Sequence, residues 1–147
     1  VNHFVGGGLM FASAFRGEPM GDPDGPMPDL VGDDPVGAYD RAMDAFRAAL
    51  ASPGALDRTI PLPFGEVPGS FVVQILLWDL AVHCWDLATA TGQPYPLSDA
   101  QVATADGIAR GFLAPDFRDG DTFAAEVGVD ADATPVEQLV AFSGRQP

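Results

Sequence analysis

The chain has 147 residues, of which 47% are apolar and 19% charged, as is typical of one soluble globular domain. Its 21 acidic residues outnumber 7 basic residues, all arginine, so the net charge is −14. This charge argues against a nucleic-acid or anionic-membrane partner, and the absence of lysine excludes Schiff-base chemistry. We expect a single domain over residues 1–147.

The location of the protein is inferred from its cysteine and its first residues. A single cysteine, Cys84, rules out an intrachain disulfide and suits a reducing cytoplasm. The first ten residues lack the cationic segment and cleavage site of a secretory signal. They begin as if in the middle of an element, so we expect further residues upstream. The apolar stretch 71–85 is too short to cross a bilayer and contains Asp79 and His83. We expect a cytoplasmic protein.

The first half of the chain has two helical patterns. Residues 1–16 carry apolar side chains at helical spacing, but three consecutive glycines cost a helix about 1 kcal/mol each. The glycines allow close approach of another helix or a ligand; a loop that precedes a helix starting at Leu9 is the alternative. After a proline-rich loop over 17–32, Asp34 caps a second helix with Pro35 at its first position, and this helix ends before Pro53.

The second half of the chain indicates three more helices. Prolines allow only a short extended piece over 59–64, and residues 123–129 favour another. A long helix over 70–91 is stopped by Gly92. Capping boxes at Ser98 and Thr134 start helices that run to about 113 and 142. Because the last of these helices is short, four main helices remain, and the fold class predicted is an all-α four-helix bundle.

The helix over 70–91 carries the chemistry. It is apolar almost all round, which is typical of a helix buried at the centre of its fold. At 100° per residue, Asp79, His83 and Asp86 share one stripe, and an ionised Asp79 in such a setting needs a partner. A buried Asp79–His83 hydrogen bond is one interpretation. The other is a metal site, because a carboxylate and an imidazole four residues apart can chelate one ion.

A metal site requires a third ligand, and the only other histidine is His3. Asp86 is either a hydrogen-bond partner of an imidazole or a solvated residue where the helix emerges, and we favour the second interpretation. Cys84 points about 100° away from His83, so a cysteine–histidine nucleophilic pair is not expected. Core packing is the default for Cys84, Trp78 and Trp85. We assign no catalytic residue.

Several segments resemble the actinobacterial DinB-like metal-binding family, which is related to the N-terminal domain of mycothiol-dependent maleylpyruvate isomerase. The most specific is the D-x-x-x-H-x-W-D-L-A pattern over 79–88. The others are 1–7 (VNHFVGG), 32–35 (GDDP), 62–69 (LPFGEVPG) and 142–147 (FSGRQP).

This resemblance implies a four-helix bundle that here lacks all or part of its first helix. It implies a divalent metal, with zinc in keeping with the ligands, held by His3, Asp79 and His83, where the isomerase has Glu in place of Asp79. It also implies mycothiol as a thiol cosubstrate, activated on the metal for an S-transferase or isomerase reaction with a small electrophile. A non-catalytic metal-binding or structural protein is the alternative. The oligomeric state stays open.

Overall fold

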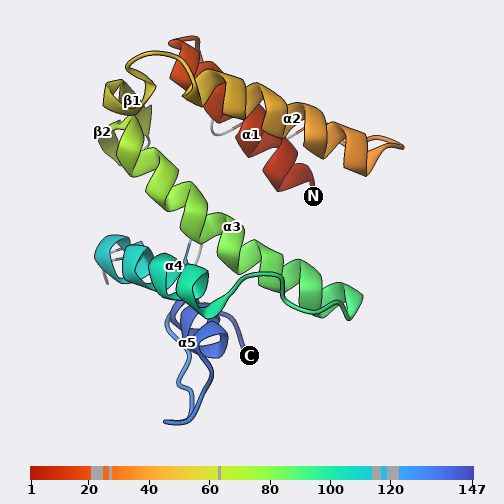
Figure 1. Cartoon of the computed structure of the whole chain (residues 1–147), viewed down its shortest axis with the longest axis vertical. Helices are drawn as coiled ribbons and strands as arrows, with labels where there is room; N and C mark the ends of the chain where they lie inside the picture. The colour runs from red at the N-terminus through yellow and green to blue at the C-terminus, as the bar shows by residue number, and fades with distance from the viewer. Residues whose placement is uncertain (21–24, 27, 63, 114–116, 119–122) are drawn as a thin grey trace. The chain divides into compact units, whose positions relative to one another are not determined.

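The structure is a computed structural model that describes residues 1–20, 25–26, 28–62, 64–113, 117–118 and 123–147. The chain divides into two compact units, Val1–Val72 and Val73–Pro147. The described residues form five α-helices and one two-stranded hairpin (Figure 1). The protein is therefore mostly helical, as expected, with one small hairpin beside the helices. The four-helix bundle and the single domain stay predictions.

In the first unit, helix α1 (Asn2–Arg16) packs against helix α2 (Pro35–Leu50), and Figure 1 shows the two side by side. Helix α1 is continuous from Asn2, so the alternative of a loop before Leu9 is wrong. One glycine of the run 6–8 has a packing reason. A Cβ at Gly8 would lie 2.5 Å from the end of the Met43 side chain and 3.4 Å from the Ala42 Cβ. The absence of a side chain at Gly8 therefore lets α1 approach α2 closely.

The start of α2 follows from its sequence. The Asp34 side chain accepts a hydrogen bond from the Gly37 amide at 2.9 Å, and Pro35 occupies the first helical position, as predicted. After α2, a short 3-10 helix η1 (Ala55–Asp57) leads into the hairpin.

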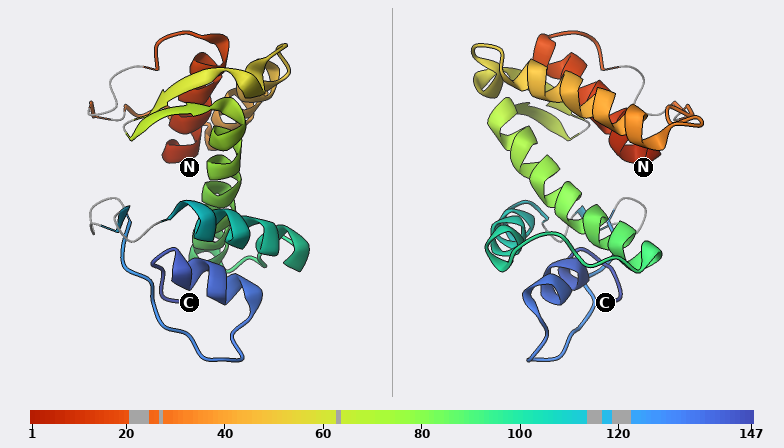
Figure 2. Two further views of the ribbon diagram at one scale, coloured as in Figure 1. Left: turned by 90° about the vertical axis from the view of Figure 1, so that its left-hand side faces the viewer. Right: turned by 45° about the vertical axis from the view of Figure 1, so that its right-hand side comes forward.

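Strand β1 (Thr59–Leu62) pairs antiparallel with strand β2 (Gly65–Pro68), with Ile60 opposite Val67 (Figure 2). The extended piece expected over 59–64 is confirmed for β1. Both strands are edge strands, where proline is tolerated, so Pro61 and Pro68 do not prevent the pairing. The fully buried Ile60 anchors the hairpin.

Helix α3 (Gly69–Thr91) is the longest element, with 23 residues. It ends as predicted, because Gly92 adopts a left-handed φ of 64° and the Gln93 amide donates back to the Ala88 carbonyl at 2.9 Å. Its length and apolar composition are sufficient for a membrane span, a criterion that core helices of soluble proteins also meet. The expectation that this apolar region is too short to span is therefore wrong.

The expectation that α3 is buried all round is also wrong, since Leu77 and Leu87 are about half exposed, at 50% and 53%. Apolar composition does not tell which helical faces receive a packing partner. Trp78 does lie in the core, as expected, whereas Trp85 is only partly buried.

In the second unit, helices α4 (Asp99–Phe112) and α5 (Pro135–Phe142) pack against each other. Both begin with the predicted capping boxes, at Ser98 and Thr134. The described residues 123–129 form no strand, and the extended backbone expected there stays a prediction. The Trp78 indole N–H donates to the buried Ser143 hydroxyl at 2.9 Å, which ties α3 to the segment 143–147 after α5.

We predict that Asp34→Ala lowers the free energy of unfolding, because it removes the side-chain acceptor at the start of α2. Chemical denaturation followed by circular dichroism measures the loss. The control is Asp33→Ala, which removes the same charge from the neighbouring exposed position. Equal losses in the two variants would contradict the capping role.

Candidate metal centre

Helix α3 places Asp79, His83 and Asp86 on one stripe, each one turn from the next. Their side chains are partly buried, with exposed fractions of 29%, 31% and 35%. At this depth a carboxylate keeps its charge at low cost only when it has partners. The structure brings the three groups together within the second unit, with His83 between the two carboxylates.

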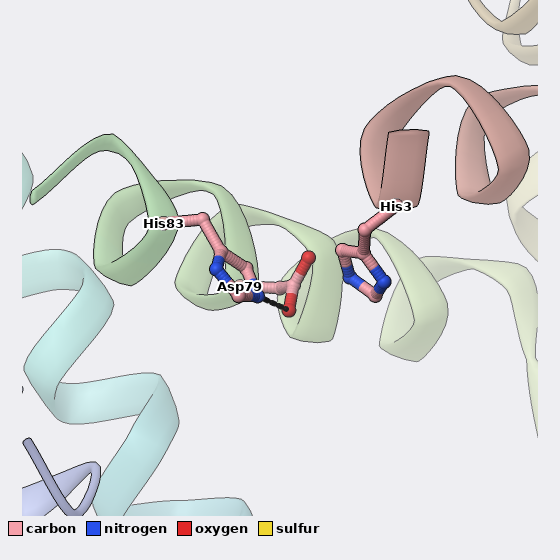
Figure 3. A group of neighbouring side chains, drawn as sticks. All are labelled: His3, Asp79 and His83. Atoms are coloured by element: carbon pink, nitrogen blue, oxygen red, sulfur yellow. Dashed lines mark ion pairs between the residues drawn. The ribbon is translucent and has the colours of Figure 1, made fainter. Parts of the chain in front are cut away.

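The two ring nitrogens of His83 face two different carboxylates. Nδ1 lies 2.8 Å from Asp86 Oδ2, and Nε2 lies 3.4 Å from Asp79 Oδ1, the ion pair marked in Figure 3. An ionised carboxylate only accepts hydrogen bonds, so Nδ1 carries the hydrogen. In the neutral ring Nε2 then presents a lone pair toward another acceptor, Asp79. This apposition is favourable only with a cation on Nε2, either a proton or a metal ion.

Asp86 is held from its other side by Arg145. The guanidinium donates from Nε to Oδ1 at 3.3 Å and from Nη2 to Oδ2 at 3.1 Å. Asp86 is therefore a partner of the imidazole, and our preference for a merely solvated Asp86 is wrong. A carboxylate on the second nitrogen of a metal-ligating histidine fixes the ring and its tautomer.

Hydrogen bonding to Asp79 raises the pKa of His83, and partial burial of the ring opposes this rise. The nearby charge of Asp86 raises the pKa further, while that of Arg145 lowers it. A raised pKa means that the site attracts positive charge, which suits a site for a metal cation.

Cys84 does not belong to this stripe. Its side chain is partly buried, and burial raises the pKa of the thiol. The thiol therefore stays protonated near neutral pH, where a protonated thiol is a poor nucleophile and a poor ligand. This agrees with the expectation that Cys84 packs as a small apolar residue.

His3 lies in the first turn of α1, in the first unit, and its side chain is exposed. The preceding Asn2 fixes this turn: its amide donates to the Pro28 carbonyl at 2.9 Å, and its carbonyl oxygen accepts from the Leu30 amide at 2.9 Å. The second unit supplies two of the predicted metal ligands, the Asp79 carboxylate and the His83 imidazole, and the first unit supplies the third, the His3 imidazole. That His3 completes the set stays a prediction.

Sequence reasoning missed Arg145. Its segment, 142–147, resembles a family motif, but its spacing indicates no partner 59 residues earlier in the chain. One sequence signal could have indicated a role for Arg145. The chain has only seven basic residues against 21 acidic ones, so each arginine is a strong candidate partner for a partly buried carboxylate.

Fold and site together define a mostly helical protein with a candidate His/Asp metal centre. The chain is 35% identical, over 150 aligned residues, to a protein of Mycobacterium tuberculosis (strain ATCC 25618 / H37Rv) named Uncharacterized protein Rv0738. The match covers 99% of this chain and 76% of that protein. Uncharacterized protein MT0763 of strain CDC 1551 / Oshkosh matches to the same extent. The chain belongs to the family of these mycobacterial proteins. No family model and no solved structure matches it.

We predict that, in protein treated with a chelator, His83 titrates above the ordinary histidine value of about 6.5 and that Asp79→Asn lowers its pKa. The stabilisation from protonated His83 is complete below about pH 6.5 and is lost as the pH rises through the higher folded pKa. Nuclear magnetic resonance titration measures the pKa, with the two histidine signals assigned through His3→Gln. An unchanged His83 pKa in Asp79→Asn would contradict the described contact.

Proposed function

We propose that the protein binds one divalent metal ion, zinc by preference, through His3, Asp79 and His83. Support comes first from the apposition of the Asp79 carboxylate and the His83 Nε2 atom, which a cation between them would satisfy. The donor set, two imidazoles and a carboxylate, is one that zinc accepts. The resemblance of residues 1–7 and 79–88 to the DinB-like family points to the same three residues.

We further propose that the bound metal serves a low-molecular-weight thiol, mycothiol in the family that the sequence resembles. A divalent ion with three protein ligands keeps open positions and lowers the pKa of a thiol that binds there. The chain itself supplies no evident nucleophile: it has no lysine, and the Cys84 thiol stays protonated. The contribution of the protein is to hold His83 in one orientation through Asp86 and Arg145.

The reaction proposed is S-transfer to a small electrophile. The sulfur of the thiol forms a bond to an electrophilic carbon, a leaving group departs from that carbon with its bonding electrons, and the thiol proton is released. Isomerisation of an acidic substrate such as maleylpyruvate is less well supported, because a chain with net charge −14 does not attract an anion.

A second candidate is a non-catalytic protein in which the same residues hold a structural ion or form only a polar contact. It is favoured by one observation: Asp79, His83, Asp86 and Arg145 already form a connected chain of ion pairs among themselves. The two experiments below separate these possibilities, the first by metal content and the second by activity.

We predict about one zinc ion per purified chain, measured by inductively coupled plasma mass spectrometry. His83→Ala should lose most of this metal, because it removes the ligand that Asp86 orients. His3→Ala and Asp79→Ala should lose metal as well. Cys84→Ala is the matched control, one position along the same helix, and should keep its metal. Full zinc content in His83→Ala would refute the site.

We predict that zinc-loaded protein accelerates adduct formation between mycothiol and a haloaromatic or epoxide acceptor, relative to mycothiol alone. Adducts are followed by absorbance or liquid chromatography. The acceleration should vanish in His83→Ala and persist in Cys84→Ala. Loss of activity in Cys84→Ala would mean that the nucleophile lies in the chain. No acceleration with any acceptor, in protein that holds zinc, would favour the non-catalytic candidate.

A further inference from the structure

Arg145 has a backbone and a side chain that are both fixed. Its amide donates to the Val140 carbonyl at 2.9 Å, in the last turn of α5, and its Nη1 donates to the Ser143 carbonyl at 3.0 Å. The remaining donors, Nε and Nη2, contact the two oxygens of Asp86. This paired geometry restricts both the position and the rotation of the carboxylate, which a single point charge does not do.

The restriction passes from Asp86 to His83. One oxygen of Asp86, Oδ2, accepts from both Arg145 Nη2 at 3.1 Å and His83 Nδ1 at 2.8 Å. When this oxygen is fixed, the Nδ1–H bond has one direction, and Nε2 on the far side of the ring is aimed at Asp79. Arg145 therefore reaches the metal ligand through one intervening side chain.

We propose that Arg145 is a positioning residue of the metal centre, and that metal binding and docking of the segment 143–147 stabilise each other. This inference rests on the proposed function, because it assumes that His83 ligates an ion. Reciprocity is a thermodynamic requirement: if the docked segment strengthens metal binding, the bound metal stabilises the docked segment by the same factor.

A purely electrostatic role predicts the opposite result. The guanidinium is a cation, so its charge alone opposes binding of a second cation nearby, and its removal would strengthen metal binding. If Arg145 positions the site, removal of its guanidinium lets Asp86 and the His83 ring rotate, and metal binding weakens. The direction of the change in affinity therefore separates the two roles.

The experiment measures zinc affinity by competition with a chromophoric chelator. Loss of a partner that orients a metal ligand costs about 10-fold to 100-fold in metal affinity, which is the range expected for Asp86→Asn. For Arg145→Gln we expect a loss of about 10-fold, at the low end of that range, because it acts through Asp86. Arg145→Lys should recover part of the loss, since it keeps the charge without the paired geometry.

Two controls make the result specific. Arg47→Gln removes the same charge from an exposed ion pair with Asp44 on α2, and its zinc affinity should equal that of the original protein. In the Asp86→Asn background, Arg145→Gln should have almost no further effect, because the two residues act as one unit. Additive losses would assign Arg145 a general structural role and overturn the proposal.

Hydrogen exchange provides a readout that does not depend on activity. Added zinc should slow exchange of the Ser143, Gly144 and Arg145 amides, which donate to carbonyls of α5, and should not do so in Asp86→Asn. Unchanged or tighter zinc binding in Arg145→Gln, or unchanged exchange in the original protein, overturns the inference while the proposed function survives. Absence of zinc binding in the original protein overturns both.

Discussion

The site depends on one shared carboxylate oxygen, Asp86 Oδ2, which accepts from His83 Nδ1 at 2.8 Å and from Arg145 Nη2 at 3.1 Å. Because Nδ1 carries the hydrogen that it donates to Asp86, a neutral His83 ring has its lone pair on Nε2, the atom that faces Asp79. Two groups that both accept hydrogen bonds then face each other on a partly buried stripe of α3. That conflict makes the stripe a place for a cation, and the raised pKa of His83 expresses the same preference for a proton.

The same oxygen links segments that are distant in the sequence. Trp78 and Asp86 lie two turns apart on α3, and both are tied to the segment after α5, through Ser143 and Arg145 respectively. The Trp78–Ser143 hydrogen bond is buried and holds the segment in place. The Asp86–Arg145 ion pair is partly exposed and depends on that placement. In this way, packing in the second unit is connected to the orientation of His83, a candidate metal ligand.

Local signals predicted the helices well, and long-range contacts account for what was missed. Capping boxes at Ser98 and Thr134 and the Asp34-Pro35 pair acted through neighbours a few residues away, so their helices could be located from sequence alone. The Asp79–His83 pair was predictable for the same reason, since four residues of helix bring the two side chains together. The Asp86–Arg145 contact spans 59 residues and was not. The β1–β2 hairpin was missed because its prolines were weighed without knowing that both strands are edges.

We propose that an ion at this centre is held by two imidazoles and a carboxylate, without the thiol of the chain. X-ray absorption at the zinc edge, on zinc-loaded protein without added thiol, identifies the ligand atoms. We expect nitrogen and oxygen scatterers at about 2.0–2.2 Å and the outer-shell signature of two imidazoles, reduced to one in His3→Ala. A sulfur scatterer at about 2.3 Å, or a single imidazole in the original protein, would contradict it.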